Sequence, residues 1–170
     1  MVNLIIVGTL TWFHIFSVIG WSGAALTFLV SIRPTVAKFS PQASGEFILK
    51  TFPRFVRSVQ IFTVMTVIFG PLLALAMADG PPNAFDLKSP WSLCVTAGAS
   101  IGITTFLVVF LLLTPTASKI IRIAQGMQQN PTKQPPAELG KLQKRLAMIP
   151  PLGVTLLLSA EVFMVAAAQF

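Results

Sequence analysis

The chain is poor in the residues that most often carry chemistry in proteins. Its 170 residues include one cysteine, Cys94, and one histidine, His14. A single cysteine excludes a disulfide within the chain and a cysteine-based metal cage, so a soft-metal site would need methionine, carboxylate or backbone ligands, or a partner chain. The sequence also has no P-loop, no dinucleotide-binding glycine motif and no Cys/His zinc spacing. These absences predict that the protein is not an enzyme.

Charged residues are also scarce. They make up 10% of the chain, whereas hydrophobic residues make up 54%; a soluble domain has about 25% charged residues. This composition predicts a membrane protein, with the lipid bilayer as its first partner. The net charge of +7 would suit nucleic acid, but the excess is concentrated in two loops between apolar runs. We therefore expect no nucleic-acid partner.

Four apolar runs are long enough to cross a bilayer, which takes about 20 residues. They cover residues 4–32, 56–77, 91–113 and 146–168. The first run lacks a preceding basic segment and is too long for a signal peptide, so we expect it to remain as a span. The sequence predicts an all-α fold, an integral membrane four-helix bundle that forms a single transmembrane domain over residues 1–170.

The distribution of charge predicts an orientation. Loop 33–57 has five basic residues against Glu46, and loop 119–145 has six against Glu138. Cytoplasmic loops are enriched in lysine and arginine, so both loops are predicted to be cytoplasmic, with the N- and C-termini and segment 79–88 outside. We expect a multi-pass protein of the cytoplasmic (plasma) membrane.

Prolines and glycines predict several local features. Gly70-Pro71 should kink the second helix, because proline removes an intrahelical hydrogen bond, and residues 80–83 (GPPN) should form an external turn. The charged segments 119–127 and 138–145 are expected to extend the third and fourth helices at the cytoplasmic side.

A short internal similarity suggests a repeat. Residues 32–38 resemble residues 113–119, at an offset of 81, with Pro-Thr followed three residues later by lysine. One hypothesis is a duplicated two-helix hairpin; the alternative is that Pro-Thr is a common way to end a helix. At the same offset His14 aligns with Val95.

His14 lies within the first apolar run, where an ionisable group normally faces protein rather than lipid. At helical spacing it shares a face with residues 17, 21, 24 and 28, and the small pair Gly20/Ala24 should let a neighbouring helix approach closely. We expect the histidine to face the bundle. It is either a neutral imidazole hydrogen-bonded to a neighbouring helix or a ligand of a metal or haem.

Glu161 is the acidic residue within the fourth run, and its expected depth is similar to that of His14. The two could be neighbours if the first and fourth helices pack together, and Met164 shares the face of Glu161. His14, Glu161 and Met164 are therefore the candidate metal ligands. The alternatives are a protonated, packed Glu161 and a methionine that serves only packing.

Other polar residues have simpler roles. Asp79 and Asp86 could attract cations outside the membrane. The polar side chains of the second helix should form interhelical hydrogen bonds; they are Gln60, Thr63 and Thr66.

The pattern His14-x6-Trp21-x-Gly23-Ala24, followed by Arg33-Pro34, resembles the first helix of copper-resistance protein D-like membrane domains. Those domains have a histidine, a tryptophan seven residues later and then a small pair. The pattern is also distantly similar to the membrane-bound protoporphyrinogen oxidase family, in which the first-helix histidine is implicated in haem binding. That family has a lysine after a tryptophan near the start of the third helix, where this chain has Trp91 but only Cys94 and Val95 nearby. The resemblance therefore implies the fold and the importance of His14 rather than that enzymatic activity.

Three functions remain open at this stage. The first is a copper-related, non-enzymatic metal-handling protein that uses His14 near the outer face, with copper as its cofactor. The second is an accessory or structural subunit of a larger membrane complex, such as a copper monooxygenase or a respiratory oxidoreductase, with other membrane subunits as partners and no cofactor of its own. The third is a membrane redox protein that binds haem b through His14.

Overall fold

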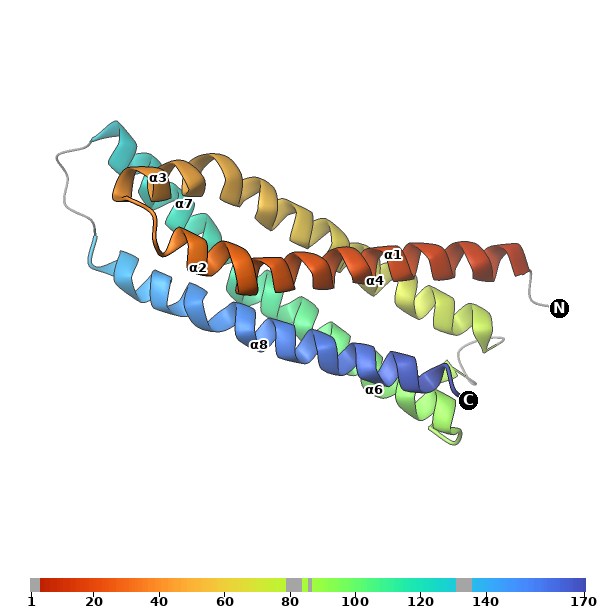
Figure 1. Cartoon of the computed structure of the whole chain (residues 1–170). Helices are drawn as coiled ribbons and strands as arrows, with labels where there is room; N and C mark the ends of the chain where they lie inside the picture. The colour runs from red at the N-terminus through yellow and green to blue at the C-terminus, as the bar shows by residue number, and fades with distance from the viewer. Residues whose placement is uncertain (1–3, 79–83, 86, 131–135) are drawn as a thin grey trace.

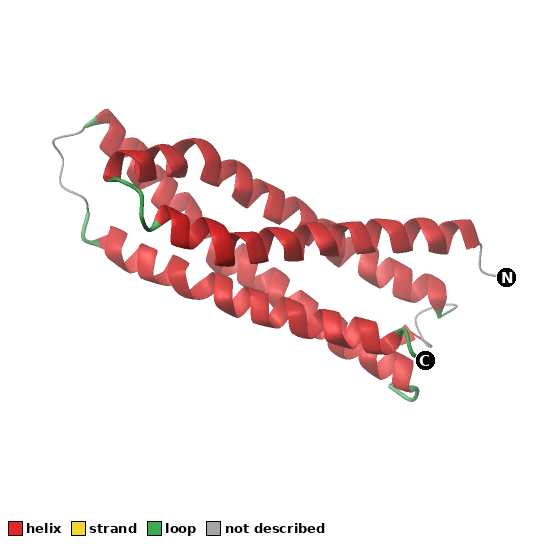
Figure 2. Cartoon of the chain, in the orientation of Figure 1, coloured by secondary structure: helices red, strands yellow, loops and turns green. Residues whose placement is uncertain are grey.

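The computed structural model describes residues 4–78, 84–85, 87–130 and 136–170. Over these residues the chain is all-helical (Figure 2), as the sequence predicted, and has four helices long and apolar enough to cross a membrane. It is therefore a multi-pass membrane protein. The predicted external turn at residues 80–83, Asp79 and Asp86 lie outside the described residues.

The four long helices are continuous rods, and the first three of them each contain a short segment of wider helical pitch. They cover Leu4–Val36, Pro41–Met77, Pro90–Gln129 and Glu138–Ala167, with 33, 37, 40 and 30 residues. At 1.5 Å per residue they are about 45–60 Å long, longer than the roughly 30 Å hydrocarbon core. Three of the four extend well beyond the predicted spans, and the expected extensions over 119–127 and 138–145 are confirmed.

The rods divide into named elements in chain order. These are α1 (Leu4–Thr27), η1 (Phe28–Ile32), α2 (Arg33–Val36), α3 (Pro41–Glu46), η2 (Phe47–Thr51), α4 (Phe52–Met77), α6 (Pro90–Leu107), η3 (Val108–Leu113), α7 (Thr114–Gln129) and α8 (Glu138–Ala167). The η segments are π-helical turns.

Each π-helical turn comes immediately before a proline-containing turn. The backbone N–H groups of Arg33, Phe52 and Thr114 donate to carbonyls five residues earlier. The next residue in each case is a proline, whose ring would collide with the carbonyl four residues back in a regular helix. Widening the preceding turn relieves this collision, so the helix continues past the proline instead of breaking.

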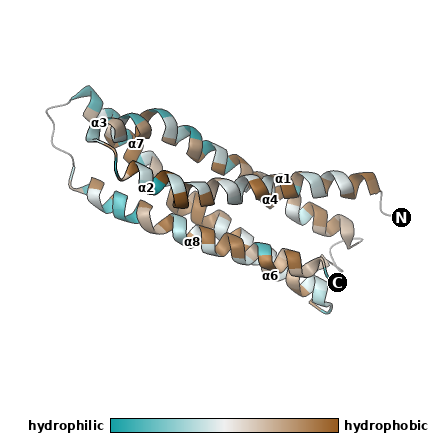
Figure 3. Ribbon diagram, viewed as in Figure 1, coloured by the Kyte–Doolittle hydropathy of each residue, from teal (hydrophilic) through white to brown (hydrophobic). Residues whose placement is uncertain are grey.

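The helices form two antiparallel pairs (Figure 1). α1 packs along α4, and α6 packs along α8, while contacts between the pairs are fewer. The N-terminal end of α1 and the C-terminal end of α8 lie at the same end of the bundle. The connection after α2 and the C-terminal end of α7, which belong to the two basic segments, lie at the other end (Figures 1 and 3).

The centre of the bundle contains one buried residue from each rod. These residues are Trp21, Val59, Val109 and Leu157. The outer face keeps large apolar side chains exposed on every rod, including Ile19, Leu111 and Val162, which are 63–67% exposed. This pattern suits helices surrounded by lipid, which is as apolar as leucine.

Candidate functional site

His14 faces the neighbouring helix α4, as predicted. Its imidazole lies against Gly70 and beside the backbone of Thr66. A Cβ atom added at Gly70 would lie 2.9 Å from Cε1 and 3.2 Å from Nδ1 of the imidazole. The ring therefore occupies space that exists because residue 70 has no side chain. Pro71 follows within α4, which continues to Met77 without a break.

A small polar cluster surrounds the histidine. The buried hydroxyl of Ser17 donates to the backbone carbonyl of His14 at 2.8 Å, and Thr66 Oγ1 lies 3.1 Å from Ser17 Oγ. The imidazole Nδ1 is buried and has no hydrogen-bond partner in the described part of the chain. A buried polar atom without a partner is uncommon, which makes His14 the place in this cluster where a ligand could bind.

Glu161 lies at a different interface, where α8 meets α1. Its carboxylate accepts a hydrogen bond from the hydroxyl of Ser22. Ser22 comes eight residues after His14, so the two positions are about 12 Å apart along the axis of α1. The first and fourth helices thus do pack together at Glu161, which was the condition for a His14–Glu161 contact, but the side chain that α1 supplies there is Ser22.

Met164 lies at a third interface, between α8 and α6. Its Cε would be 2.9 Å from a Cβ atom added at Gly98. The methionine fills the groove left by a glycine, which is a packing role. His14, Glu161 and Met164 therefore each contact a different helix.

The other polar predictions have mixed outcomes. Gln60 Nε2 donates to Thr114 Oγ1 of α7 at 3.0 Å and so joins two helices. Thr66 Oγ1 lies 3.1 Å from Ser17 Oγ of α1 and 2.9 Å from the carbonyl of Phe62 in its own helix. Thr63 does not join helices, because its hydroxyl donates to the carbonyl of Val59 in its own helix at 2.6 Å. A threonine in an apolar helix can satisfy itself in this way without a neighbour.

The residues present can be tested against the groups that the sequence suggested. No three His, Cys, Asp or Glu side chains gather as metal ligands in the described residues, and the copper set His14/Glu161/Met164 is divided among three interfaces. A haem would need space beside His14, and His14 lines neither the ≈ 50 Å³ cavity between the helix pairs nor the ≈ 390 Å³ pocket formed by Met77, Trp91 and Phe170 with their neighbours. Neither group fits within a single chain in this arrangement.

Comparison with known proteins gives no further guidance. No family model, no curated protein and no solved structure matches the chain. The function of the chain is therefore inferred from the geometry of its own residues.

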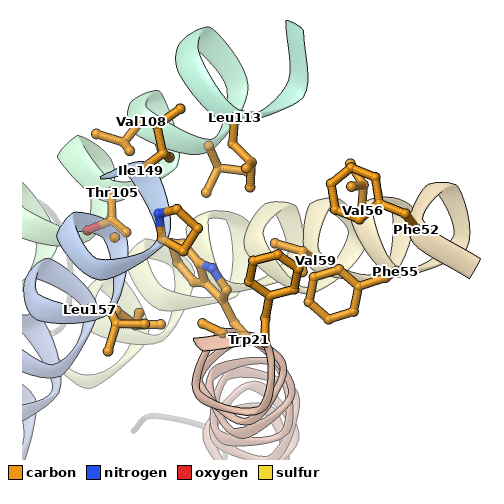
Figure 4. A pocket seen from close by; sticks show the side chains of 16 residues that line it. Trp21, Phe52, Phe55, Val56, Val59, Thr105, Val108, Leu113, Ile149 and Leu157 are labelled. Atoms are coloured by element: carbon orange, nitrogen blue, oxygen red, sulfur yellow. The ribbon is translucent and has the colours of Figure 1, made fainter. Parts of the chain in front are cut away.

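Sequence reasoning missed the cavity in the centre of the bundle (Figure 4). Its walls come from all four rods, from Trp21 on α1 to Leu157 on α8. The sequence did place Trp21 on the inner face of the first helix. No sequence pattern connects Trp21 with the lining residues of the other three rods, because those residues are far away along the chain.

Proposed function

We propose that the protein is a non-enzymatic accessory subunit of a larger membrane complex. The proposal depends on one observation: the polar side chains within the spans form contacts between helices. Ser17 with Thr66, Ser22 with Glu161 and Gln60 with Thr114 each join two helices. In a membrane such contacts fix helices relative to one another, and none of these groups is gathered around a substrate cleft.

The proposal includes an orientation in the cytoplasmic membrane. The basic ends of the rods lie on the cytoplasmic side, with both termini outside. Support comes from the lysine and arginine excess of the two loops at the same end of the bundle, since such loops are retained in the cytoplasm. Alkaline phosphatase fused after Phe170 should be active, and a fusion within the loop after α2 should be inactive.

The size of the particle that contains the protein, after extraction from the membrane in detergent, tests the subunit role. Extracted from native membranes in mild detergent, the 18.3 kDa chain should migrate within an assembly that contains other membrane proteins at fixed stoichiometry. The assembly should persist when the extract is diluted and fractionated by a second method. A chain that migrates alone, or only with copies of itself, contradicts the proposal.

A copper-handling role is the second candidate, and the unpartnered Nδ1 of His14 favours it. Neutral imidazole is a good copper ligand, and further ligands would come from a partner chain, which makes this role compatible with the first. Elemental analysis of the native assembly for copper and iron tests it. Copper near one per chain, lost in His14→Ala and kept in Met164→Leu, supports a ligand role for His14, whereas equal metal content in both variants contradicts it.

A haem b role is the third candidate, with His14 as one axial ligand. Iron in the same elemental analysis, together with a haem absorption spectrum that His14→Ala abolishes, would support it. Copper without iron would exclude it.

A further inference from the structure

The cavity between the helix pairs lies near the middle of the rods. Trp21 is about equally far from the two ends of the rod Leu4–Val36, and the cavity extends from there toward Phe52, Val56 and Leu113, at the basic-loop ends of the second and third apolar runs. Its volume of ≈ 50 Å³ corresponds to the space of about three to five water molecules. A small ring or a short length of hydrocarbon chain is of comparable size.

A glycine leaves this space open. Gly153 of α8 lines the cavity, and a Cβ atom added there would have no neighbour within 4 Å. Pro150, one turn earlier on the same helix, forms part of the same wall. The wall of α8 is therefore shallow at Gly153, between the larger side chains of Ile149, Val154 and Leu157.

The indole of Trp21 extends into this space from α1 (Figure 4). The residue is only 2% exposed, and the hydrogen bonds of the described residues include none from its N–H. Indole nitrogen is a donor only, and a buried tryptophan N–H normally finds an acceptor. Nε1 of Trp21 is not among the fully buried side-chain atoms without a partner, which in the described residues are His14 Nδ1 and Thr96 Oγ1. The N–H therefore opens on the cavity, where it is free to donate to a bound molecule.

Water is a poor candidate for that partner. A buried water typically makes about three hydrogen bonds, and the one other polar side chain among the described lining residues is Thr105. The hydroxyl of Thr105 already donates to the carbonyl of Ile101 at 2.8 Å. The remaining walls are aliphatic or aromatic, so they favour an apolar molecule.

We propose that the cavity binds a lipid-soluble carbonyl compound, whose carbonyl oxygen accepts a hydrogen bond from Nε1–H of Trp21 while its hydrocarbon part fills the space beside Gly153. The ring of a quinone and the acyl chain of an ester share this chemistry. Both dissolve in the membrane and would reach the cavity from it. This site is independent of the proposed subunit role and of His14.

The indole N–H signals of the protein test the proposal directly. With 15N-labelled tryptophan in a maltoside detergent, which has no carbonyl group, Trp12, Trp21 and Trp91 should give three signals, assigned by single Trp→Phe variants. Cyclohexanone represents the ring compound, methyl octanoate the acyl ester and methylenecyclohexane a hydrocarbon of similar shape. The Trp21 proton should shift downfield in a saturable way with one or both carbonyl compounds, and the probe with the tighter binding identifies the source.

Matched glycine variants locate the binding. Gly153→Leu should fill the cavity and remove the saturable shift. Gly102→Leu should leave it unchanged, because Gly102 is equally uncrowded but does not line the cavity. Trp21→Phe keeps the ring and removes the donor, so it should weaken carbonyl binding about tenfold, measured by the increase in unfolding temperature that the probe produces.

Three results would overturn the proposal. They are a Trp21 signal that does not saturate with either carbonyl compound, equal binding of methylenecyclohexane and cyclohexanone, and equal effects of Gly153→Leu and Gly102→Leu. If Gly153→Leu does not fold, the comparison of Trp21→Phe with the unsubstituted protein still decides whether the donor recognises a carbonyl.

Discussion

The two helix pairs follow the same backbone plan but are packed with different side chains. In the first pair, aromatic rings join the helices, with Phe13 stacked on Phe69 at 4.9 Å and Phe28 on Phe55 at 5.2 Å. In the described part of the second pair, the ring contact is Phe106 with Phe110, both on the same rod. The second pair is instead joined by close approach at Gly98, where an added Cβ would lie 3.2 Å from the backbone oxygen of Ala160.

The positions of the π-helical turns in the two pairs also agree with the hypothesis of an internal repeat. The widened turn at Arg33–Phe28 recurs at Thr114–Val109, and both residues of each bond are related by the same offset of 81. A third such turn precedes Pro53, where no repeat was expected. Proline alone does not impose the turn, because Pro71, Pro150 and Pro151 lie within α4 and α8 without a π-helical turn before them. The two pairs share the position of the turn, while side chains determine how each pair packs. At the same offset Trp21 corresponds to Gly102, so the second pair has no equivalent of the cavity donor.

The largest loss of stability is expected on truncation of Trp21, because its side chain packs against both helix pairs. Trp21→Ala should lower the free energy of unfolding by about 3–5 kcal/mol, because it removes the largest buried side chain of the central cluster and enlarges the cavity. Trp12→Ala is the control, since Trp12 is 59% exposed and should cost much less. Reversible unfolding in detergent measures both, and similar losses would show that Trp21 does not join the pairs.

The next largest loss of stability should distinguish the close helix approach at Gly98 in the second pair from the packing of aromatic rings in the first pair. Gly98→Ala should destabilise the protein by about 1–2 kcal/mol, because the new methyl group meets backbone atoms that cannot move aside. Gly20→Ala should cost less, since its obstacle is the ring of Phe62, which can rotate. Gly102→Ala and Gly23→Ala are the uncrowded controls on the same two helices. A larger loss of stability for Gly20→Ala than for Gly98→Ala would contradict this difference between the two helix pairs.

A smaller effect concerns the polar contact between the pairs. A double-mutant cycle of Ser22→Ala and Glu161→Gln should give a coupling free energy of about 0.6–1.7 kcal/mol, as measured for hydrogen bonds in membranes. The cycle of Ser17→Ala and Thr66→Val, within the first pair, provides the comparison. Additive effects of Ser22→Ala and Glu161→Gln would remove this link between the pairs.

The smallest effect is expected at the polar end of the second pair. Lys119 of α7 and Glu138 of α8 form an ion pair at 3.6 Å, with both side chains more than half exposed. Glu138→Gln should cost less than about 0.5 kcal/mol, and the difference should vanish at high salt. A salt-independent loss above 1 kcal/mol would mean that this contact holds α7 against α8.

The sequence by itself determined the four spans, their common helical structure and the separation of basic loops from termini. These properties are local, because length, apolar composition and charge act on each segment independently of its neighbours in the fold. The inward direction of His14 was also predictable, since helical spacing relates it to Ser17 and Trp21 on one face. The continuation of helices beyond the apolar runs followed from their charged but helix-compatible ends.

Only the tertiary structure decided which side chains meet. In lipid, apolar surface has no preferred partner, so the pairing of helices depends on fine packing at positions such as Gly70 and Gly98. The spacing of His14, Glu161 and Met164 along their helices could not show that each faces a different neighbour. The cavity beside Trp21 likewise depends on four rods at once, and one of its lining residues, Gly153, is far away along the chain.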